Sequence, residues 1–334
     1  MLASDRKDSP TCFIEDIQSE ILNLPKIELH AHLNGCVRLS HLSDLVDPAT
    51  LPDPSKMQDL TTGFAFMASV SALTRDPAIL RVVVERVLED FEKDGVVYIE
   101  LKSGPKSSEK ISKRKYIECI IAAMKAHKGR LIPRYTISID QSKPLEDMIE
   151  NAQLAIEYNT LSDICVGVDI SGDVFKANKE HSLRVLKMCK NAGLKISCHI
   201  AEDLESGISS HTADLLRQIL PDRLGHATMI PVGSEDGDFV RKNKIPIECC
   251  MTSNVFCKTV KSYKEHHFKT WWDLGHPVLL CTDDSGTFNT TLSKEYQLAI
   301  KSFGFTVENL KTMNRSAIEW VFDNSVKERL RKMI

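Results

Sequence analysis

The sequence lacks the features of a membrane-spanning, secreted or nucleic-acid-binding protein. No apolar run in its 334 residues approaches the ~20 residues needed to cross a bilayer. The stretch from Met1 to Ser9 contains no apolar core, so we expect no secretory signal there. The 43 lysines and arginines are offset by 46 acidic residues, for a formal net charge of -3. That balance gives no sign of a surface for nucleic acid or for an anionic membrane.

Cysteine is present but follows no pattern. The 10 cysteines are scattered and no Cys-x-x-Cys occurs, which argues against a structural zinc site or a thioredoxin-like motif. Cys165, Cys198 and Cys281 lie inside apolar, strand-like runs, where a free cysteine behaves as a small hydrophobic residue. We therefore expect reduced thiols in a cytosolic protein.

The chain also lacks low-complexity tracts, long linkers and solenoid repeats. A hydrophobic fraction of 42% and a charged fraction of 27% exclude disorder as the main state. The length permits two domains, but it also fits a single α/β barrel, which takes about 250 residues or more.

What recurs along the chain is a short apolar run followed by a helical pattern. Eight runs are rich in β-branched residues, the number that a (β/α)8 barrel requires. They are Lys26–His30, Val96–Leu101, Arg134–Ile139, Ile164–Ile170, Lys195–Ile200, Arg223–His226, Ile245–Cys249 and Val278–Thr282. Their nearly continuous apolar character is typical of strands buried on both faces.

The segments between these runs have helical periodicity. Ile79–Lys93 carries an apolar stripe and ends at Asp94-Gly95, and Val307–Arg331 closes the chain with a helical pattern. Leu42–Ala78 is long for one connection, so we expect extra helices inserted after the first strand. The fold class is therefore α/β, a TIM (β/α)8 barrel. We expect one catalytic domain over residues 17–334, after a flexible leader over residues 1–16.

A pair of histidines marks the end of the first strand. His30 and His32 are two residues apart, so they point to the same face of a strand and into the barrel. Two neutral imidazoles at that spacing are a natural pair of ligands for a divalent metal. Alone the pattern is weak, and a coincidental pair with one ring buried and one exposed is an equal alternative.

The ends of other strands carry ligand-type residues as well. His199 ends the fifth run with Glu202 three residues later, His226 ends the sixth, and Asp283 and Asp284 follow the eighth. Barrel enzymes place their sites on this face. A helix-capping role could explain the two aspartates, but explaining the whole set structurally needs several independent coincidences.

Four motifs together resemble the signature set of the adenosine deaminase family. They are His30-Ala-His32-Leu-Asn-Gly35, His199-Ile-Ala-Glu202, Gly225-His226 and Thr282-Asp283-Asp284. The resemblance covers the chain from about Pro25 to the last helix, and it implies that the barrel is of the metal-dependent hydrolase type. Asn34, together with Asp169-Ile-Ser-Gly172-Asp173 and Ser253-Asn254, is most similar to the adenosine deaminase-like subgroup. That subgroup deaminates N6-methyl-AMP and related N6-substituted purine nucleoside monophosphates.

The resemblance implies a role for each matching residue. One zinc ion per chain would be held by His30, His32, His199 and Asp283. Glu202 would protonate purine N1, His226 would orient and polarise the attacking hydroxide, and Asp284 would contact that hydroxide and the purine. The substrate-binding residues would be His32, Asn34, Ser103, Gly104, Pro105, Lys106, Asp140, Gly172 and Asp284. Among them, the Gly172 N–H would contact purine N3 and Asn34 the ribose side.

The chemistry supports this set independently of the resemblance. Zinc lowers the pKa of bound water to about 7 and so makes hydroxide available for attack at C6. Electron density then flows into the ring, and a carboxylic acid at Glu202 can protonate N1. The tetrahedral centre expels methylamine or ammonia. Zinc deaminases of the cytidine type use a Cys-rich site instead, and nothing in this sequence matches that pattern.

Two segments bear on the substrate. The wider family usually has Asp where this chain has Asn34, and a carboxylate there would repel a 5′-phosphate; the alternative is that Asn34 only satisfies a turn before Gly35. The subgroup usually has Arg-Ser-Thr-Pro-Arg where this chain has Lys102-Ser-Gly-Pro-Lys106. Lysine binds phosphate only as a point charge, and both lysines could instead belong to a surface loop.

The leading hypothesis is hydrolytic deamination of N6-methyl-AMP to IMP and methylamine by a cytosolic monomer that binds no nucleic acid and no membrane. Adenosine, adenine or AMP could be the substrate with the same mechanism. Another metal hydrolase acting on an amide or phosphoester, or an inactive binding protein on this scaffold, remain alternatives. His266 and His267 are adjacent and are not assigned as ligands, because neighbours on a strand cannot face the same way.

Overall fold

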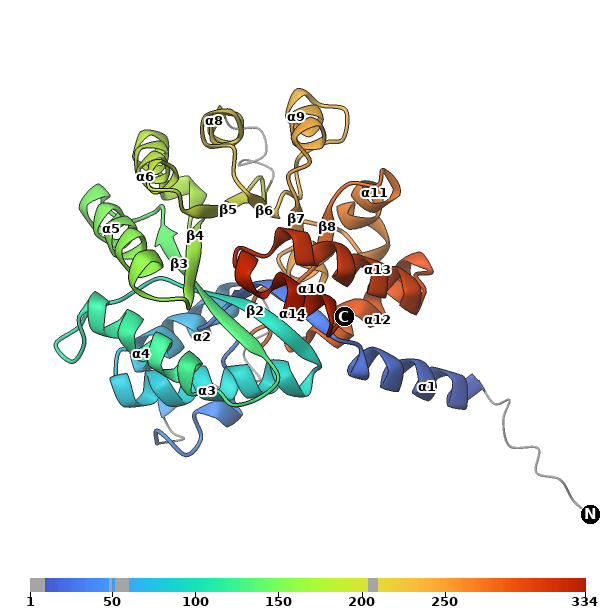
Figure 1. Cartoon of the computed structure of the whole chain (residues 1–334), viewed down its shortest axis with the longest axis horizontal. Helices are drawn as coiled ribbons and strands as arrows, with labels where there is room; N and C mark the ends of the chain where they lie inside the picture. The colour runs from blue at the N-terminus through green and yellow to red at the C-terminus, as the bar shows by residue number, and fades with distance from the viewer. Residues whose placement is uncertain (1–9, 48–49, 52–59, 204–209) are drawn as a thin grey trace, which may run out of the picture.

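The computed structural model describes residues 10–47, 50–51, 60–203 and 210–334. Eight parallel strands form one sheet whose spatial order is the order of the chain (Figure 1). The strands are β1 (Lys26–His32), β2 (Val96–Ser103), β3 (Ile132–Asp140), β4 (Cys165–Ser171), β5 (Lys195–Ile200), β6 (Arg223–His226), β7 (Ile247–Cys249) and β8 (Val278–Leu280). Each overlaps one of the eight predicted runs, so the predicted barrel is confirmed.

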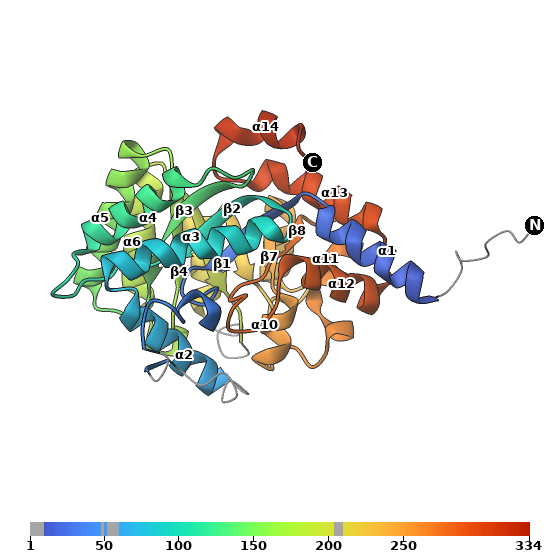
Figure 2. The ribbon, with the colours of Figure 1, turned by 90° about the horizontal axis from the view of Figure 1, so that it is seen from below.

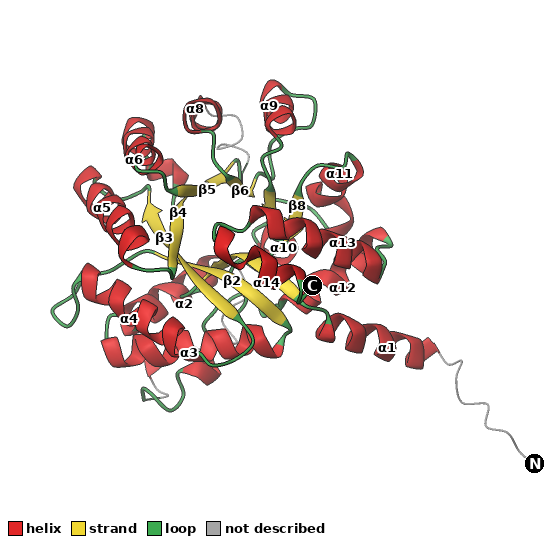
Figure 3. Ribbon diagram, viewed as in Figure 1, coloured by secondary structure: helices red, strands yellow, loops and turns green. Residues whose placement is uncertain are grey.

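Helices surround the strands (Figure 3). Their bounds are α1 (Pro10–Asn23), α2 (Leu60–Leu73), α3 (Pro77–Lys93), α4 (Lys113–Ala126), α5 (Leu145–Leu161), α6 (Lys179–Asn191), α8 (Ser210–Asp214), α9 (Glu235–Asn243), α10 (Met251–Phe256), α11 (His267–Asp273), α12 (Leu292–Phe303), α13 (Val307–Ala317) and α14 (Lys327–Arg331). The apolar stripe predicted for Ile79–Lys93 is the buried face of α3, which Asp76 caps by accepting from the Ala78 N–H. None of the described helices is long and apolar enough to span a membrane.

The barrel closes between its last and first strands. An isolated parallel bridge pairs Ala31 with Asp283. Its two hydrogen bonds run from the Asp283 N–H to the His30 carbonyl (2.8 Å) and from the His32 N–H to the Asp283 carbonyl (3.0 Å). Closure therefore occurs between the histidine pair and the first of the two aspartates. It brings together residues that are about 250 positions apart in the sequence.

One end of the barrel is sealed by the end of the chain. The Glu100 carboxylate accepts a hydrogen bond from the Phe322 N–H (2.6 Å), and Arg223 donates to the Trp320 carbonyl (2.8 Å). The guanidinium of Arg223 also lies 3.5 Å from the centroid of the Phe322 ring. Figure 2 shows α14 at this end and α2 and α10 at the opposite end, so the open face is the one at the carboxyl ends of the strands.

The ends of the chain and the segment after β1 can be compared with the sequence prediction. Helix α1 begins at Pro10, residues 1–9 lie outside the described residues, and the flexible leader over residues 1–16 stays a prediction. The expectation of extra helical structure after the first strand is confirmed by α2, while residues 48–49 and 52–59 are not described. The pattern over Val307–Arg331 is not one helix, because Val321 adopts an extended conformation that carries the chain across the sealed end.

Candidate metal and substrate site

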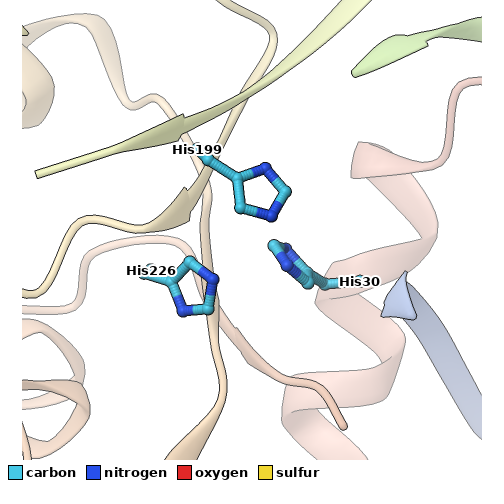
Figure 4. A group of neighbouring side chains, drawn as sticks. All are labelled: His30, His199 and His226. Carbon is cyan, nitrogen blue, oxygen red and sulfur yellow. The ribbon is translucent and has the colours of Figure 1, made fainter. Parts of the chain in front are cut away.

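The two histidines of β1 point into the open end of the barrel, as predicted. His30 is fully buried, whereas His32, one step nearer the opening, keeps 22% of its side chain exposed. Figure 4 shows the His30 ring facing those of His199 and His226 across the barrel. These imidazoles converge because parallel strands end at the same face.

The candidate ligand atoms of the four predicted metal-binding residues lie close together. The His32 Nε2 atom lies 3.4 Å from Nε2 of His30 and 3.1 Å from Nε2 of His199. The Asp283 Oδ1 atom lies 3.5 Å from Nε2 of His30 and 3.4 Å from Nε2 of His32. A tetrahedral zinc ion with bonds of about 2.0–2.1 Å separates its ligand atoms by about 3.3–3.4 Å. These four separations match the spacing that such an ion requires, and His30, His32 and Asp283 together form a group that could hold a metal ion.

The hydrogen bonds of the ring nitrogens fit this role. Nδ1 of His30 lies 2.7 Å from Oε2 of Glu248, and Nδ1 of His199 lies 3.1 Å from Oδ1 of Asp169 and 3.2 Å from the Ile170 carbonyl. Glu248, Asp169 and the Ile170 carbonyl only accept, and Lys102 Nζ, which also lies 3.2 Å from Nδ1 of His30, has acceptors for its three protons in Glu248, Asp169 and Ser197, so both Nδ1 atoms carry the proton. Their Nε2 lone pairs are then free to bind a cation, the usual arrangement behind metal-ligating histidines.

The carboxylates behind the histidines share one buried ammonium group. Lys102 Nζ donates its three protons to Glu248 (2.9 Å), Asp169 (3.0 Å) and Ser197 (3.0 Å). Burial opposes ionisation of Asp169, but its electrostatic interactions with His199 and with the Lys102 ammonium, together with the hydrogen bond from His199, outweigh burial and hold the pKa of this carboxyl well below its ordinary value.

The expectation that Lys102 faces a phosphate is therefore wrong. β2 runs on to Ser103, two residues beyond its predicted end, so Lys102 lies inside the strand and points into the barrel. The hydroxyl of Ser103 points the other way and bonds to the Tyr116 hydroxyl of α4 (2.8 Å), so it is already engaged.

Asp283 is held in an unusual backbone conformation. Its φ of 61° lies in the left-handed region, which non-glycine residues adopt mainly where the surroundings enforce it. Here the bridge to β1 supplies that constraint. The Ser253 hydroxyl donates to Oδ2 (2.7 Å), which leaves Oδ1 directed at the histidines. The neighbouring Asp284 packs against Gly35 so closely that a Cβ at Gly35 would lie 1.7 Å from Oδ1 of Asp284.

The three predicted catalytic groups lie around the metal ligands. Nε2 of His226 is 3.7 Å from Oε1 of Glu202 and 3.9 Å from Oδ2 of Asp283. Removal from water, then the negative charge of Asp283, raises the pKa of Glu202 to about 7. The same two causes raise the pKa of Asp284, whose buried Oδ1 has no hydrogen-bond partner among the described residues.

The predicted substrate-binding residues lie at the carboxyl ends of β1 to β3 or in the segments that follow β1 to β4, except for Asp284, which follows β8. Asn34 Oδ1 accepts from the Thr74 hydroxyl (3.2 Å), so the amide NH2 points away from Thr74. Asp140, at the end of β3, accepts from Ser142 N–H (2.9 Å). Gly172 has a φ of 94°, and a Cβ there would lie 2.1 Å from Oδ1 of Asp140; only glycine fits this turn.

Lys106 belongs to a group of cations that the sequence did not reveal. Its Nζ bonds to the Ser71 hydroxyl (2.6 Å). Burial, then the positive charges of Arg75 and Lys143, lowers the pKa of Lys106 to about 8. Of the neighbours in its segment, Pro105 is buried, and Gly104 lies close enough to the Ser138 carbonyl that an added Cβ would be 3.2 Å from it.

Sequence reasoning missed the residues that orient the ligands. Glu248 and Lys102 show no signal by themselves, because their partners come from other strands. Asp169, Ser253 and Asn254 were noticed only through the family resemblance, with no role attached.

Known proteins resemble this chain over nearly its whole length. A sequence profile described as "Adenosine deaminase" matches residues 25–334. The chain is 36% identical over 329 residues to the N6-methyl-AMP deaminase of Danio rerio, covering 92% of this chain and 94% of that protein. The apo structure of the N6-methyl-AMP deaminase from Arabidopsis thaliana aligns with a TM-score of 0.85 at 32% identity, over 95% of this chain and 97% of that one. The crystal structure of Arabidopsis ADAL complexed with IMP aligns with a TM-score of 0.84 at 32% identity, over 96% and 97%. The chain therefore belongs to the adenosine deaminase family and is an aminohydrolase of that family.

Proposed function

We propose that this protein is a zinc-dependent deaminase that converts N6-methyl-AMP to IMP and methylamine. The observation that carries the proposal is the cluster of His30, His32, His199 and Asp283, in which neighbouring ligand atoms lie 3.1–3.5 Å apart and which could hold a metal ion, with Glu202 next to His226 at its edge. Relatives named as N6-methyl-AMP deaminases, at about a third identity over nine-tenths of the chain, support the substrate class.

Three imidazoles and one carboxylate suit zinc among the common divalent metals. When bound, such an ion supplies hydroxide at neutral pH. The protein's part is to hold His30 and His199 in the Nδ1–H form, through Glu248 and Asp169. The Nε2 lone pairs of these histidines and the carboxylate of Asp283 then point toward one position.

Glu202 is the group that we assign to protonation of purine N1. With a pKa of about 7, a large fraction of the carboxyl carries a proton at neutral pH, which suits a general acid. Its side chain keeps 38% of its surface exposed toward the opening, so a substrate ring can reach it. His226 and Asp284 flank the same space and are assigned to holding the attacking oxygen and the purine.

The proposed 5′-phosphate site lies between α2, β2 and β3. Lys106 faces Ser71, and the charges of Arg75 and Lys143 act on it. The mutual repulsion of these three cations is offset in part by Asp140, which also acts on Lys106 and lies 3.7 Å from Lys143 Nζ, and a phosphate would relieve the rest. The neutral amide of Asn34 adds a donor without a negative charge. The relative solved with IMP shows that a protein of this type holds a nucleoside monophosphate.

The test is a side-by-side turnover assay of the zinc-loaded protein on N6-methyl-AMP, AMP, N6-methyladenosine and adenosine. We expect turnover of N6-methyl-AMP, with kcat/KM for the nucleosides at least about 100-fold lower, the worth of ~2.7 kcal/mol of phosphate binding. Turnover of adenosine at a comparable rate would keep the reaction and discard the nucleotide assignment. Zinc binding without turnover of any purine would overturn the proposed function.

We further propose that the protein works in the cytosol. The nine cysteines whose side chains the structure describes are all free, and seven of them are buried. Unpaired thiols of this number are typical of a reducing compartment.

A further inference from the structure

We infer that His266 is a positioning residue that acts through Asn254 to fix which nitrogen of His226 carries the proton. The adjacent His266 and His267 have no place in the site described above. Nevertheless, both are linked to His226: the His266 side chain reaches the His226 side chain by way of Asn254, and the His267 side chain bonds to the His226 backbone carbonyl. The side chains of His226, Asn254 and His266 are all at most 1% exposed, so water does not compete for their hydrogen bonds.

The direction of the first bond is unambiguous. The Phe268 backbone N–H donates to Nδ1 of His266 (3.1 Å) at the start of α11. A backbone N–H can only donate, so Nδ1 of His266 is unprotonated and Nε2 carries the single ring proton. Burial, which lowers the pKa of His266 well below its ordinary value, agrees with a neutral ring.

The protonation of His266 fixes donor and acceptor in the next two hydrogen bonds, His266–Asn254 and Asn254–His226. Nε2 of His266 lies 3.1 Å from Oδ1 of Asn254, and Nδ2 of Asn254 lies 3.3 Å from Nδ1 of His226. Since Nε2 of His266 donates, the amide oxygen must face it, because the opposite orientation would set two donors against each other. The amide NH2 consequently donates to Nδ1 of His226, which must accept. His226 is thereby held as the Nε2–H tautomer.

This tautomer determines what His226 can do. His30, His199 and His226 together are close enough to hold one metal ion, so distance alone does not choose among them. An Nε2 atom that carries a proton has no lone pair for a metal, and Nδ1 is occupied by Asn254. His226 is therefore excluded from coordination. It presents an N–H donor to the space between Glu202 and Asp283, 3.7 and 3.9 Å away.

His267 holds the backbone of the same residue. Its Nε2–H donates to the His226 carbonyl (2.7 Å), where His226 and Ala227 both have positive φ values of 61° and 50°. Such a pair of left-handed, non-glycine residues is costly and persists only where contacts enforce it. The two rings are stacked, with centroids 4.4 Å apart. The adjacent histidines thus act on opposite sides of one residue.

Two substitutions distinguish the proposed effect of His266 on the His226 tautomer from a merely structural role of His266. In His266→Asn, the new side-chain oxygen can still accept from the Phe268 N–H, and Asn is a favourable N-cap, but the donor to Asn254 is lost. In Asn254→Asp, one NH2 becomes an oxygen, so the side chain accepts from both rings and forces a proton onto Nδ1 of His226. The first variant removes the donor that fixes the orientation of the Asn254 amide. The second makes Nδ1 of His226 a donor instead of an acceptor.

The experiment is long-range 1H–15N correlation spectroscopy of the zinc-loaded protein labelled with 15N-histidine, with His226 assigned from His226→Gln. We expect the Nε2–H tautomer in the unsubstituted protein, a proton on Nδ1 in Asn254→Asp and a mixture of tautomers in His266→Asn. The catalytic consequence rests on the proposed function: in His266→Asn we expect kcat to fall about tenfold, the lower end for an outer partner of a metal site, with KM and Tm unchanged.

A proton on Nδ1 of His226 in the unsubstituted protein, or a metal-bound Nε2, would overturn the inference whatever the activity. So would His266→Asn with an unaltered tautomer and an unaltered kcat. The tautomer is read without any turnover. Failure of the proposed function would instead show as zinc-loaded protein with the Nε2–H tautomer and no activity on purines, which leaves the assignment of His266 intact.

Discussion

Lys102 Nζ lies 2.9 Å from Oε2 of Glu248, the same oxygen that is 2.7 Å from Nδ1 of His30. One carboxylate oxygen thus joins a buried cation to a predicted metal ligand. Lys102 also reaches Asp169, which stands behind His199. The ammonium group is therefore the common neighbour of both carboxylates that orient the ligand histidines.

Replacement of Lys102 by Met is expected to destabilise the protein. The change leaves Glu248 and Asp169 buried with one positive partner fewer, and breaking a buried ion pair costs about 3–5 kcal/mol. Urea denaturation of the metal-free protein should show a correspondingly lower midpoint. Lys102→Arg, which keeps the charge, is the matched control and should lose less. Equal stability of Lys102→Met and the parent would show that the network does not depend on the cation.

Much of this architecture could be predicted from sequence, for definite reasons. The alternation in Glu28-Leu-His30-Ala-His32 exposes the ligand pair directly, since residues two apart share a face of a strand. The order of the barrel strands follows chain order, so strand ends could be assigned to one face without knowledge of register.

The partners across the barrel could not be predicted in the same way. Whether Lys102 faces inward depends on where β2 ends, and it ends two residues later than its apolar run suggests. Its contacts with Asp169 on β4 and Glu248 on β7 depend on the register of strands far apart in sequence. The break before Phe322 likewise follows from its bond to Glu100, a contact that helical periodicity does not encode.

Replacement of Glu202 by Gln is expected to abolish turnover while metal stays bound. The amide keeps the size of the side chain but cannot transfer a proton to purine N1, and general acid catalysis contributes about 10²–10⁴-fold. The measurement pairs kcat on N6-methyl-AMP with zinc content by elemental analysis. Asp283→Ala is the contrasting variant, in which zinc content itself should fall. Substantial activity in Glu202→Gln would place the acid elsewhere.

Lys106 predicts a pH dependence that is specific to the nucleotide. Its pKa is lowered to about 8, chiefly by burial, so the free protein loses this positive charge as pH rises above 8, and kcat/KM reports groups of the free enzyme. The 5′-phosphate stays dianionic over this range, because its second pKa is about 6. The ratio of kcat/KM for N6-methyl-AMP to that for N6-methyladenosine should therefore fall from pH 7 to pH 9, by up to about tenfold for one pH unit above the pKa.

The control for this prediction is Lys106→Arg. A guanidinium stays protonated throughout the range, so the ratio should become independent of pH. The same decline in both proteins would mean that a different group titrates.

Asn34→Asp tests whether the neutral amide selects for the nucleotide. The Thr74 hydroxyl donates to Oδ1 of Asn34 (3.2 Å), a bond that an aspartate can keep, so the substitution changes charge with little change in shape. The new carboxylate would then stand near the proposed phosphate site, and two like charges a few ångströms apart near a protein surface repel by a few kcal/mol. The ratio of kcat/KM for N6-methyl-AMP to that for N6-methyladenosine should fall by about tenfold or more, with activity on the nucleoside retained.

Asn34→Ala separates the two possible causes: it removes the amide donor without adding charge, so a loss confined to Asn34→Asp identifies repulsion. An unchanged ratio in both variants would leave Asn34 with only its role in the turn before Gly35, and selection for the nucleotide would then depend on Lys106 and its neighbouring cations.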